Sequence, residues 1–281
     1  MTGTGRRLPV LALAGSTHPG PTLAVTFITV TLGLAVGLEL WRLAVLGVAM
    51  LCGQVSVGLS NDWLDAARDA ASVRTDKPVA RGDVSPRLAR GTAFTALALA
   101  IAFTVPLGVA ALGAHLIFLA AGWGYNLGLK GTAVSVLPYV VGFGVLPLLV
   151  TVSLPSHAVA AWWAIGAGAL LGVAAHFANA LPDLDADRAT GVLGLPHRVG
   201  ARASGIVTFA ALAAASGLVV FGPGRPGFVG WACLAIEASI AIAGTVLVLT
   251  RPPGRPLFRL VILGAIVAVV AFVLSGAHLT A

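Results

Sequence analysis

Two short segments of this chain gather carboxylates in a pattern that could do chemistry. The sequence has 281 residues, of which 58% are hydrophobic and only ten are acidic. Five of the ten lie within "NDWLDAARD" (61–69) or shortly after it, and three lie within "DLDAD" (183–187). The other two are Glu39 and Glu237. Each segment begins where a long apolar run ends, so both are expected at the depth of a membrane surface.

Helical spacing places the polar side chains of each segment on one face. At 100° per residue, Asp62, Asp65 and Asp69 fall within about 60° of arc, and Asn61 widens the arc to about 100°. In the second segment Asn179, Asp183 and Asp187 recur at intervals of four residues, which again predicts a single face.

Crowded carboxylates need a counter-charge, and the sequence offers two kinds. Hard oxygen ligands suit Mg²⁺, which takes one or two carboxylates and completes its shell with water and phosphate. Basic side chains that could face phosphate oxygens follow close by: Arg74, Lys77, Arg81, Lys130 and Arg198. A lone aspartate at a helix end usually caps the helix or is solvated. Two matched acidic faces beside bases instead indicate a diphosphate site.

The composition requires membrane helices to position these residues. The mean hydropathy is +0.98 and only 10% of the side chains are charged, which excludes a soluble protein of this length. We predict an all-α, polytopic membrane protein with nine transmembrane helices. The apolar runs lie near 20–38, 41–60, 90–108, 111–128, 132–152, 158–179, 201–221, 228–249 and 258–279. Residues 1–15 are expected to form an amphipathic lead-in helix rather than a signal peptide.

The basic residues predict the orientation. With nine spans, fifteen Lys and Arg residues fall on one side and two, Arg42 and Arg225, on the other. Positive side chains concentrate in the cytoplasm, so we expect the N-terminus inside, the C-terminus outside and both acidic segments facing the cytoplasm, in the cell inner membrane. The net charge of +7 then reflects topology, and nucleic acid is not expected as a partner. Cys52 and Cys233 lie within predicted spans, which indicates neither a disulfide nor a metal cluster.

The two acidic segments also align with each other at an offset of 118 residues. The five matched pairs are Asn61 with Asn179, Asp65 with Asp183, Asp69 with Asp187, Pro78 with Pro196, and Gly82 with Gly200. This favours an internal duplication of helix–loop–helix units, 41–108 and 158–221, within a single domain covering 1–281.

At these residues the chain resembles the UbiA superfamily of intramembrane prenyltransferases. That family carries N-D-x-x-D-x-x-x-D after its second helix and D-x-x-x-D after its sixth, which read here "NDWLDAARD" and "DLDAD". "RTDKPVARG" (74–82) is similar to its basic stretch, and "DRATGVLGLPHRVG" (187–200) to the continuation of its second motif. "YNLGLKGT" (125–132) resembles its Tyr/Lys element and "HPGPT" (18–22) the entry to its first helix.

The resemblance implies a nine-helix bundle around a central cavity, under a cytoplasmic cap. Mg²⁺ would bind the diphosphate of a polyprenyl diphosphate donor, whose chain would enter an apolar tunnel. The implied metal ligands are Asn61 and Asp65, supported by Asp62 and Asp69, with Asp183 and Asp187 on the second side. The implied diphosphate-binding residues are Arg74, Lys77 and Lys130, with Tyr125 nearby and Arg81 and Arg198 as further candidates.

Three residues are candidates for binding or deprotonating an acceptor: Gln54, His176 and Asn179. Gln54 stands where some aromatic prenyltransferases of the family have an arginine. His176 shares a face with Asn179 and Asp183, so it could deprotonate or orient an acceptor. The histidines His18, His115, His157 and His278 lack acidic neighbours in the sequence and are assigned no role.

Three functions remain open from the sequence. The first is prenyl transfer to a small acceptor, an aromatic compound or quinone precursor, with release of diphosphate. The second is a cyclase that ionises the same donor and uses the donor's own double bond as the nucleophile. The third is a cation transporter or channel that uses intramembrane carboxylates. The acids cluster at one rim of the predicted bundle rather than near its midplane, which argues against this function.

Overall fold

The computed structural model describes residues 9–71, 77–189, 191–251, 255–274 and 279–280. Within these ranges the regular structure is helical, apart from an isolated bridge between Ala160 and Thr280. The α-helices are α1 (Pro9–Gly15), α2 (Pro19–Ala35), α3 (Leu40–Ala71), α4 (Pro86–Thr104), α5 (Val109–Leu127), α6 (Leu137–Val152), α7 (Trp162–Ala180), α8 (Leu184–Ala189), α9 (Leu195–Phe221), α10 (Phe228–Thr250) and α11 (Arg255–Leu274). Short 3₁₀ turns are η1 (Val105–Leu107), η2 (Leu129–Gly131) and η3 (Leu181–Asp183).

Six stretches of the described chain are long and apolar enough to cross a membrane. They are Leu40–Ala71, Pro86–Leu107, Val109–Leu127, Trp162–Asp183, Leu195–Phe221 and Phe228–Thr250. Shorter apolar helices cover Pro19–Ala35, Leu137–Val152 and Arg259–Leu274. The all-α prediction is confirmed, and the six stretches support a polytopic membrane protein. The count of nine spans and the cytoplasmic cap stay predictions.

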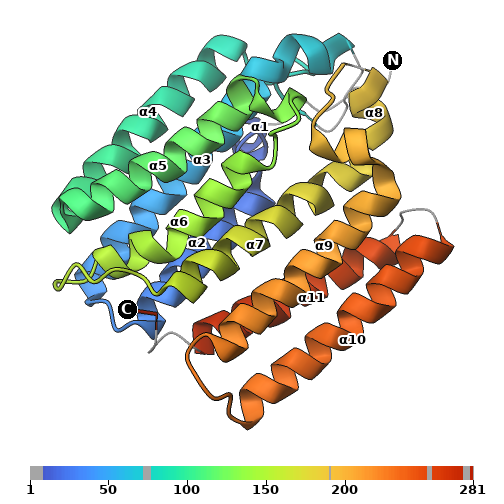
Figure 1. Ribbon diagram of the computed structural model, residues 1–281. Coiled ribbons are helices and arrows are strands. Elements are labelled where there is room, and N and C mark those ends of the chain that lie inside the picture. Colours follow the sequence, from blue (N-terminus) through green and yellow to red (C-terminus); the bar gives the residue numbers. More distant parts are fainter. Residues whose placement is uncertain (1–8, 72–76, 190, 252–254, 275–278, 281) are drawn as a thin grey trace.

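The helices pack as a closed ring with two helices outside it. Each of α2, α3, α5, α6, α7, α9 and α11 contacts the next in this order, and α11 returns to α2. Helix α4 packs outside against α3 and α5, whereas α10 packs outside against α9 and α11 (Figure 1). Residues 77–85 of the α3–α4 connection, the α5–α6 connection and α8 lie at one end of the bundle, here called the polar end (Figure 1).

Several helix boundaries differ from those predicted, for local reasons. Helix α3 continues to Ala71, eleven residues past the predicted end of its span, so the first acidic segment belongs to a spanning helix. Helix α7 ends at Ala180 and is followed by η3, because Pro182 has no N–H group to continue the helical bonding. The second acidic segment is therefore broken and does not form one continuous helical face.

Close helix packing at glycine brings α6 and α7 together. A Cβ atom at Gly172 would lie 2.3 Å from the backbone oxygen of Tyr139, and one at Gly168 would lie 2.4 Å from that of Phe143. Small residues permit such backbone approach between membrane helices. The contact places one face of α6, with Tyr139 and Phe143, directly against α7.

The N-terminal connection lies over α3 in a similar way. A Cβ atom at Gly58 would lie 2.4 Å from the backbone oxygen of Thr17. Ala12 on α1 packs with Leu59, Val79 and Val84 in a small apolar cluster. The described part of the expected lead-in helix, α1, thus covers the polar end beside the first acidic segment.

Candidate active site

The first acidic segment presents buried carboxylates, as its spacing predicts. Asp62, Asp65 and Asp69 lie on α3 and are 2%, 6% and 3% exposed, respectively. Ionised carboxylates out of water are costly unless they are paired and hydrogen-bonded. The surroundings of this segment must therefore supply positive charge.

Two lysines from other parts of the chain supply much of that charge. Lys77 Nζ lies 2.7 Å from Asp69 Oδ2 and 3.4 Å from Asp62 Oδ1, and it donates a hydrogen bond of 3.1 Å to Asn61 Oδ1. Lys130 Nζ lies 2.5 Å from Asp65 Oδ2. Arg68, one turn further along α3, reaches the same Asp65 oxygen at 2.7 Å. Three bases thus meet the carboxylates of one helix face.

The ammonium group of Lys130 is largely shielded from water, so few water molecules would compete with an anion for it. It lies in η2, between α5 and α6. Burial lowers the pKa of Lys130 from its ordinary value, while the adjacent Asp65 carboxylate acts in the opposite direction. A cation that is poorly hydrated interacts more strongly with an incoming anion.

The second acidic segment is more open. Asp183 and Asp187 are partly exposed, and Asn179 is exposed and donates a long hydrogen bond of 3.5 Å to the Tyr139 hydroxyl. Asp187 Oδ2 lies 3.4 Å from His197 Nε2, at the start of α9.

Tyrosines connect the two acidic segments. The ring of Tyr125, in the last turn of α5, meets the ring of Tyr139 of α6 edge to face, with ring centroids 5.2 Å apart. Tyr139 in turn accepts a hydrogen bond from Asn179 of the second segment, while Lys130 of the α5–α6 connection donates to Asp65 of the first. The two segments therefore approach the same place at the polar end (Figure 1), as the sequence predicts.

The α5–α6 connection completes this link. A Cβ atom at Gly194, just before α9, would lie 2.5 Å from the backbone oxygen of Lys130. The Ser135 hydroxyl accepts a hydrogen bond of 2.8 Å from the Leu195 backbone N–H and lies 3.1 Å from His176 Nε2. His176 is 2% exposed and contacts both tyrosine rings. Its Nδ1 atom is buried and has no hydrogen-bond partner among the described residues.

The donor set fits magnesium, although the ligands are not gathered into one preformed cluster. Within the described chain no three His, Cys, Asp or Glu side chains lie close enough together to hold a metal ion. Carboxylate and amide oxygens dominate both segments, and Mg²⁺ needs only one or two protein carboxylates when phosphate supplies other ligands. The residues present therefore match a metal that arrives together with a diphosphate.

The structure does not bring every predicted residue into the site. Arg81 pairs with Asp83 in its own loop at 2.7 Å, and Arg198 is exposed and donates to the Leu193 backbone oxygen. Gln54 lies on α3 seven residues before Asn61, about 10 Å further from the polar end. Arg74 lies outside the described residues.

Several neighbours of the site were missed from sequence. His18 lies 2.9 Å from Asp62 Oδ1, a contact that crosses 44 residues of sequence and that no local pattern indicated. Asn126 accepts a hydrogen bond of 3.1 Å from Asn61 and itself donates to Ser60. Only Arg68 had a local signal, since its spacing of three residues from Asp65 is that of a helical ion pair.

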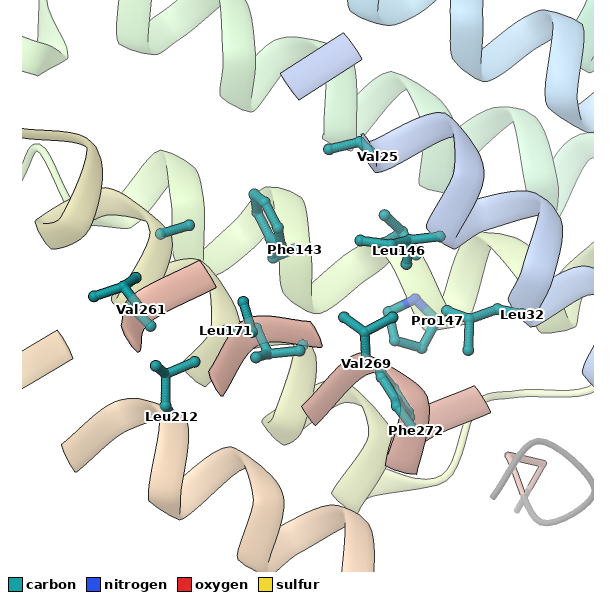
Figure 2. A pocket seen from close by; sticks show the side chains of 15 residues that line it. Val25, Leu32, Phe143, Leu146, Pro147, Leu171, Leu212, Val261, Val269 and Phe272 are labelled. Carbon is teal, nitrogen blue, oxygen red and sulfur yellow. The ribbon is translucent and has the colours of Figure 1, made fainter. Parts of the chain in front are cut away.

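An apolar cavity of about 120 Å³ lies inside the ring, away from the polar end. Helices α2, α6, α7, α9 and α11 line it with apolar side chains (Figure 2). Phe143 forms part of the wall and stacks on Tyr139, with ring centroids 6.1 Å apart. This ring contact therefore lies between the charged residues at the polar end and the apolar cavity.

Charged groups thus lie at one end of an apolar cavity inside a helical membrane bundle. The sequence model of the UbiA prenyltransferase family matches residues 21–266. The chain belongs to this family, as its motifs predicted. A comparison with curated proteins finds no significant match.

Solved structures of the same fold agree over nearly the whole chain. A UbiA homologue from Archaeoglobus fulgidus, bound to GPP and Mg²⁺, superposes with a TM-score of 0.72 at 14% identity, covering 94% of this chain and 98% of that one. A digeranylgeranylglyceryl phosphate synthase gives 0.70 at 14% identity, with 96% and 99% covered. A ligand-free UbiA homologue from Aeropyrum pernix K1 gives 0.68 at 20% identity, with 88% and 96% covered.

Proposed function

We propose that this protein is a Mg²⁺-dependent intramembrane prenyltransferase. It would move an isoprenyl group from a polyprenyl diphosphate to a small acceptor, an aromatic compound or quinone precursor, and release diphosphate. The observation that carries the proposal is the buried carboxylate face of α3, which Lys77 and Lys130 cover beside an aromatic passage to an apolar cavity. The neighbour bound to GPP and Mg²⁺ supports the choice of donor and cofactor.

The acidic residues would hold the metal and the basic ones the diphosphate. The metal-binding set is Asn61, Asp62, Asp65, Asp69, Asp183 and Asp187. When bound, Mg²⁺ supplies Lewis-acid stabilisation of the negative charge that develops on the leaving diphosphate. Lys77 and Lys130 would donate directly to phosphate oxygens and are preorganised for this by their positions at the rim. Arg74, Arg81 and Arg198 are outer candidates for the same role.

Aromatic rings would shelter the allylic cation left by departure of the diphosphate. Tyr125, Tyr139 and Phe143 form a continuous series of ring contacts from the rim to the cavity. Ring faces attract cations, and a passage lined by rings also keeps water away. His176 and Asn179 flank this passage. We assign the buried Nδ1 atom of His176 to accept a proton from, or orient, the acceptor.

The orientation completes the proposal. The imbalance of Lys and Arg favours nine spans, with the N-terminus and active site on the cytoplasmic side of the inner membrane and the C-terminus outside. The chain would form one domain. The pairs α3–α4 and α7–α9 would correspond to the units of the duplication, 41–108 and 158–221.

Product analysis tests the function. Purified protein in lipid nanodiscs is incubated with geranyl, farnesyl or geranylgeranyl diphosphate and Mg²⁺, with and without a lipid extract containing aromatic acceptors. We expect Mg²⁺-dependent diphosphate release that requires the extract, and a prenylated acceptor by mass spectrometry. Rapid release without extract, giving a hydrocarbon, would instead identify a cyclase. No release under any condition would contradict both reactions.

A further inference from the structure

We propose that Asn126 positions the side chain of Asn61, so that the amide oxygen of Asn61, and not its nitrogen, faces Lys77 and the neighbouring carboxylates. The inference rests on the proposed function, in which Asn61 is a magnesium ligand, and adds a positioning residue to it. The evidence is a chain of hydrogen bonds between α3 and α5 whose direction is fixed at both ends.

The first end of this chain is an ammonium group, which can only donate. Lys77 Nζ donates a hydrogen bond of 3.1 Å to Asn61 Oδ1. The same nitrogen lies 2.7 Å from Asp69 Oδ2 and 3.4 Å from Asp62 Oδ1. Because the amide nitrogen of Asn61 carries hydrogens, only its oxygen can accept from Lys77. The oxygen of Asn61 therefore faces the same positive charge as two carboxylates.

The other end is a backbone carbonyl group, which can only accept. Asn126 Nδ2 donates to the backbone oxygen of Val57 at 2.9 Å and to Ser60 Oγ at 2.8 Å. The Ser60 hydroxyl donates its own hydrogen to the Val57 oxygen at 2.8 Å, so its lone pairs can accept. Both N–H groups of Asn126 are thus used, and its oxygen accepts from Asn61 Nδ2, 3.1 Å away.

Close packing of α3 and α5 brings Asn126 to this place. A Cβ atom at Gly122 would lie 2.7 Å from Val57 Cγ2, so the glycine lets α5 approach α3 closely. Asn126 follows one helical turn later and lies on the same face of α5. It is only 6% exposed, so little water reaches it to compete for the Asn61 amide.

The matching asparagine of the second acidic segment is held less firmly. Asn179 is exposed, and its amide nitrogen donates to the Tyr139 hydroxyl at 3.5 Å, the outer limit of a hydrogen bond. A tyrosine hydroxyl can both donate and accept, so it does not determine which amide atom faces it. The fixed direction of the hydrogen bonds is therefore a feature of the first segment.

The orientation of Asn61 matters because Mg²⁺ binds oxygen atoms and not amide nitrogens. Without Asn126, the Asn61 amide would be free to turn over and present its N–H groups to Lys77 and to the metal, both of which repel them. Neighbours that orient a metal ligand typically contribute about 10- to 100-fold to the affinity for the metal. Asn126 should therefore affect magnesium binding through Asn61.

Metal titrations of the full-length protein in nanodiscs test this without turnover. The probe is Mg²⁺ with a thiodiphosphate analogue of geranyl, farnesyl or geranylgeranyl diphosphate, whichever the wild type binds most tightly, and calorimetry gives the Kd for the metal. Asn126→Leu should raise this Kd about 10- to 100-fold. Asn126→Ser, which is smaller and too short to reach Asn61, should act in the same way. In an Asn61→Ala background, Asn126→Leu should change the Kd by less than about twofold, because no amide is left to orient.

Ser56→Ala is the matched control. Trp123 Nε1 donates a hydrogen bond of 3.1 Å to Ser56 Oγ, which also joins α5 to α3 but lies one helical turn before Ser60. Its loss should leave the Kd for Mg²⁺ unchanged. An unchanged Kd in both Asn126 variants, or an equal rise in Ser56→Ala or in the Asn61→Ala background, would overturn the inference and leave the proposed function standing. Absence of Mg²⁺-dependent binding of every analogue to the wild type would overturn both.

Discussion

The two acidic segments share a sequence pattern but differ in their surroundings. In the first, the carboxylates of Asp62, Asp65 and Asp69 are buried on one uninterrupted helix and face basic side chains. In the second, Pro182 interrupts the helix, and Asp183 and Asp187 remain partly exposed.

This difference indicates a division of work between the segments. Buried charges must be paired for the protein to be stable, so the first segment contributes to the fold as well as to the proposed chemistry. Partly exposed carboxylates keep contact with water, so substitutions in the second segment should cost less stability than substitutions in the first. The predictions that follow test this division.

The largest effect is expected at Asp65, which contacts both Lys130 and Arg68. Asp65→Asn keeps the shape but removes the charge, so Mg²⁺ and the diphosphate lose their central anchor. We expect the rate of diphosphate release to fall by about two to three orders of magnitude. The unpaired Lys130 should also lower the free energy of unfolding by about 1–3 kcal/mol. Steady-state kinetics and thermal melts measure both, and unchanged stability would contradict the first half of the comparison.

At Asp187 we expect a loss of function without a loss of stability. Asp187→Asn should reduce the rate of diphosphate release by about 10- to 100-fold. The melting temperature without Mg²⁺ should match that of the wild type, because the carboxylate is partly solvated. A melting temperature that falls as far as in Asp65→Asn would show that both segments are equally structural.

Magnesium and a diphosphate should stabilise the protein only when the acidic face is intact. With 100-fold excess over Kd, a bound ligand adds about 2.7 kcal/mol to the free energy of unfolding. We expect Mg²⁺ with geranylgeranyl diphosphate to raise the melting temperature of the wild type, and EDTA to abolish the rise. The same rise in Asp65→Asn would argue against a metal on this face.

The smallest effect is expected at Arg81, which pairs with Asp83 in its own loop. Arg81→Gln should change the rate of diphosphate release by less than about threefold, because a partly exposed ion pair contributes little. Lys77→Gln is the matched comparison, since Lys77 contacts Asp69, Asp62 and Asn61, and it should reduce the rate at least about tenfold. Equal effects would place Arg81 in the site after all.

The local features of the chain could be predicted because they depend on neighbours in sequence. Long apolar runs indicate helices, and helical periodicity placed Asp62, Asp65 and Asp69 on one buried face, as the structure confirms. The start of α4 is equally local, because the Ser85 side chain caps the helix and Pro86 follows it. Periodicity failed at 179–187, where Pro182 overrides the ideal spacing.

What sequence alone determined is the family, the helical composition and the two acidic segments, since motifs and hydrophobic patterns are written in consecutive residues. Only the tertiary structure decided which base meets which acid: Lys130 reaches Asp65 across 65 residues, and His18 reaches Asp62 across 44. It also decided the apolar cavity, whose wall combines five helices. Such contacts depend on how helices pack, through close approaches like that at Gly172, and no local pattern specifies which faces will meet.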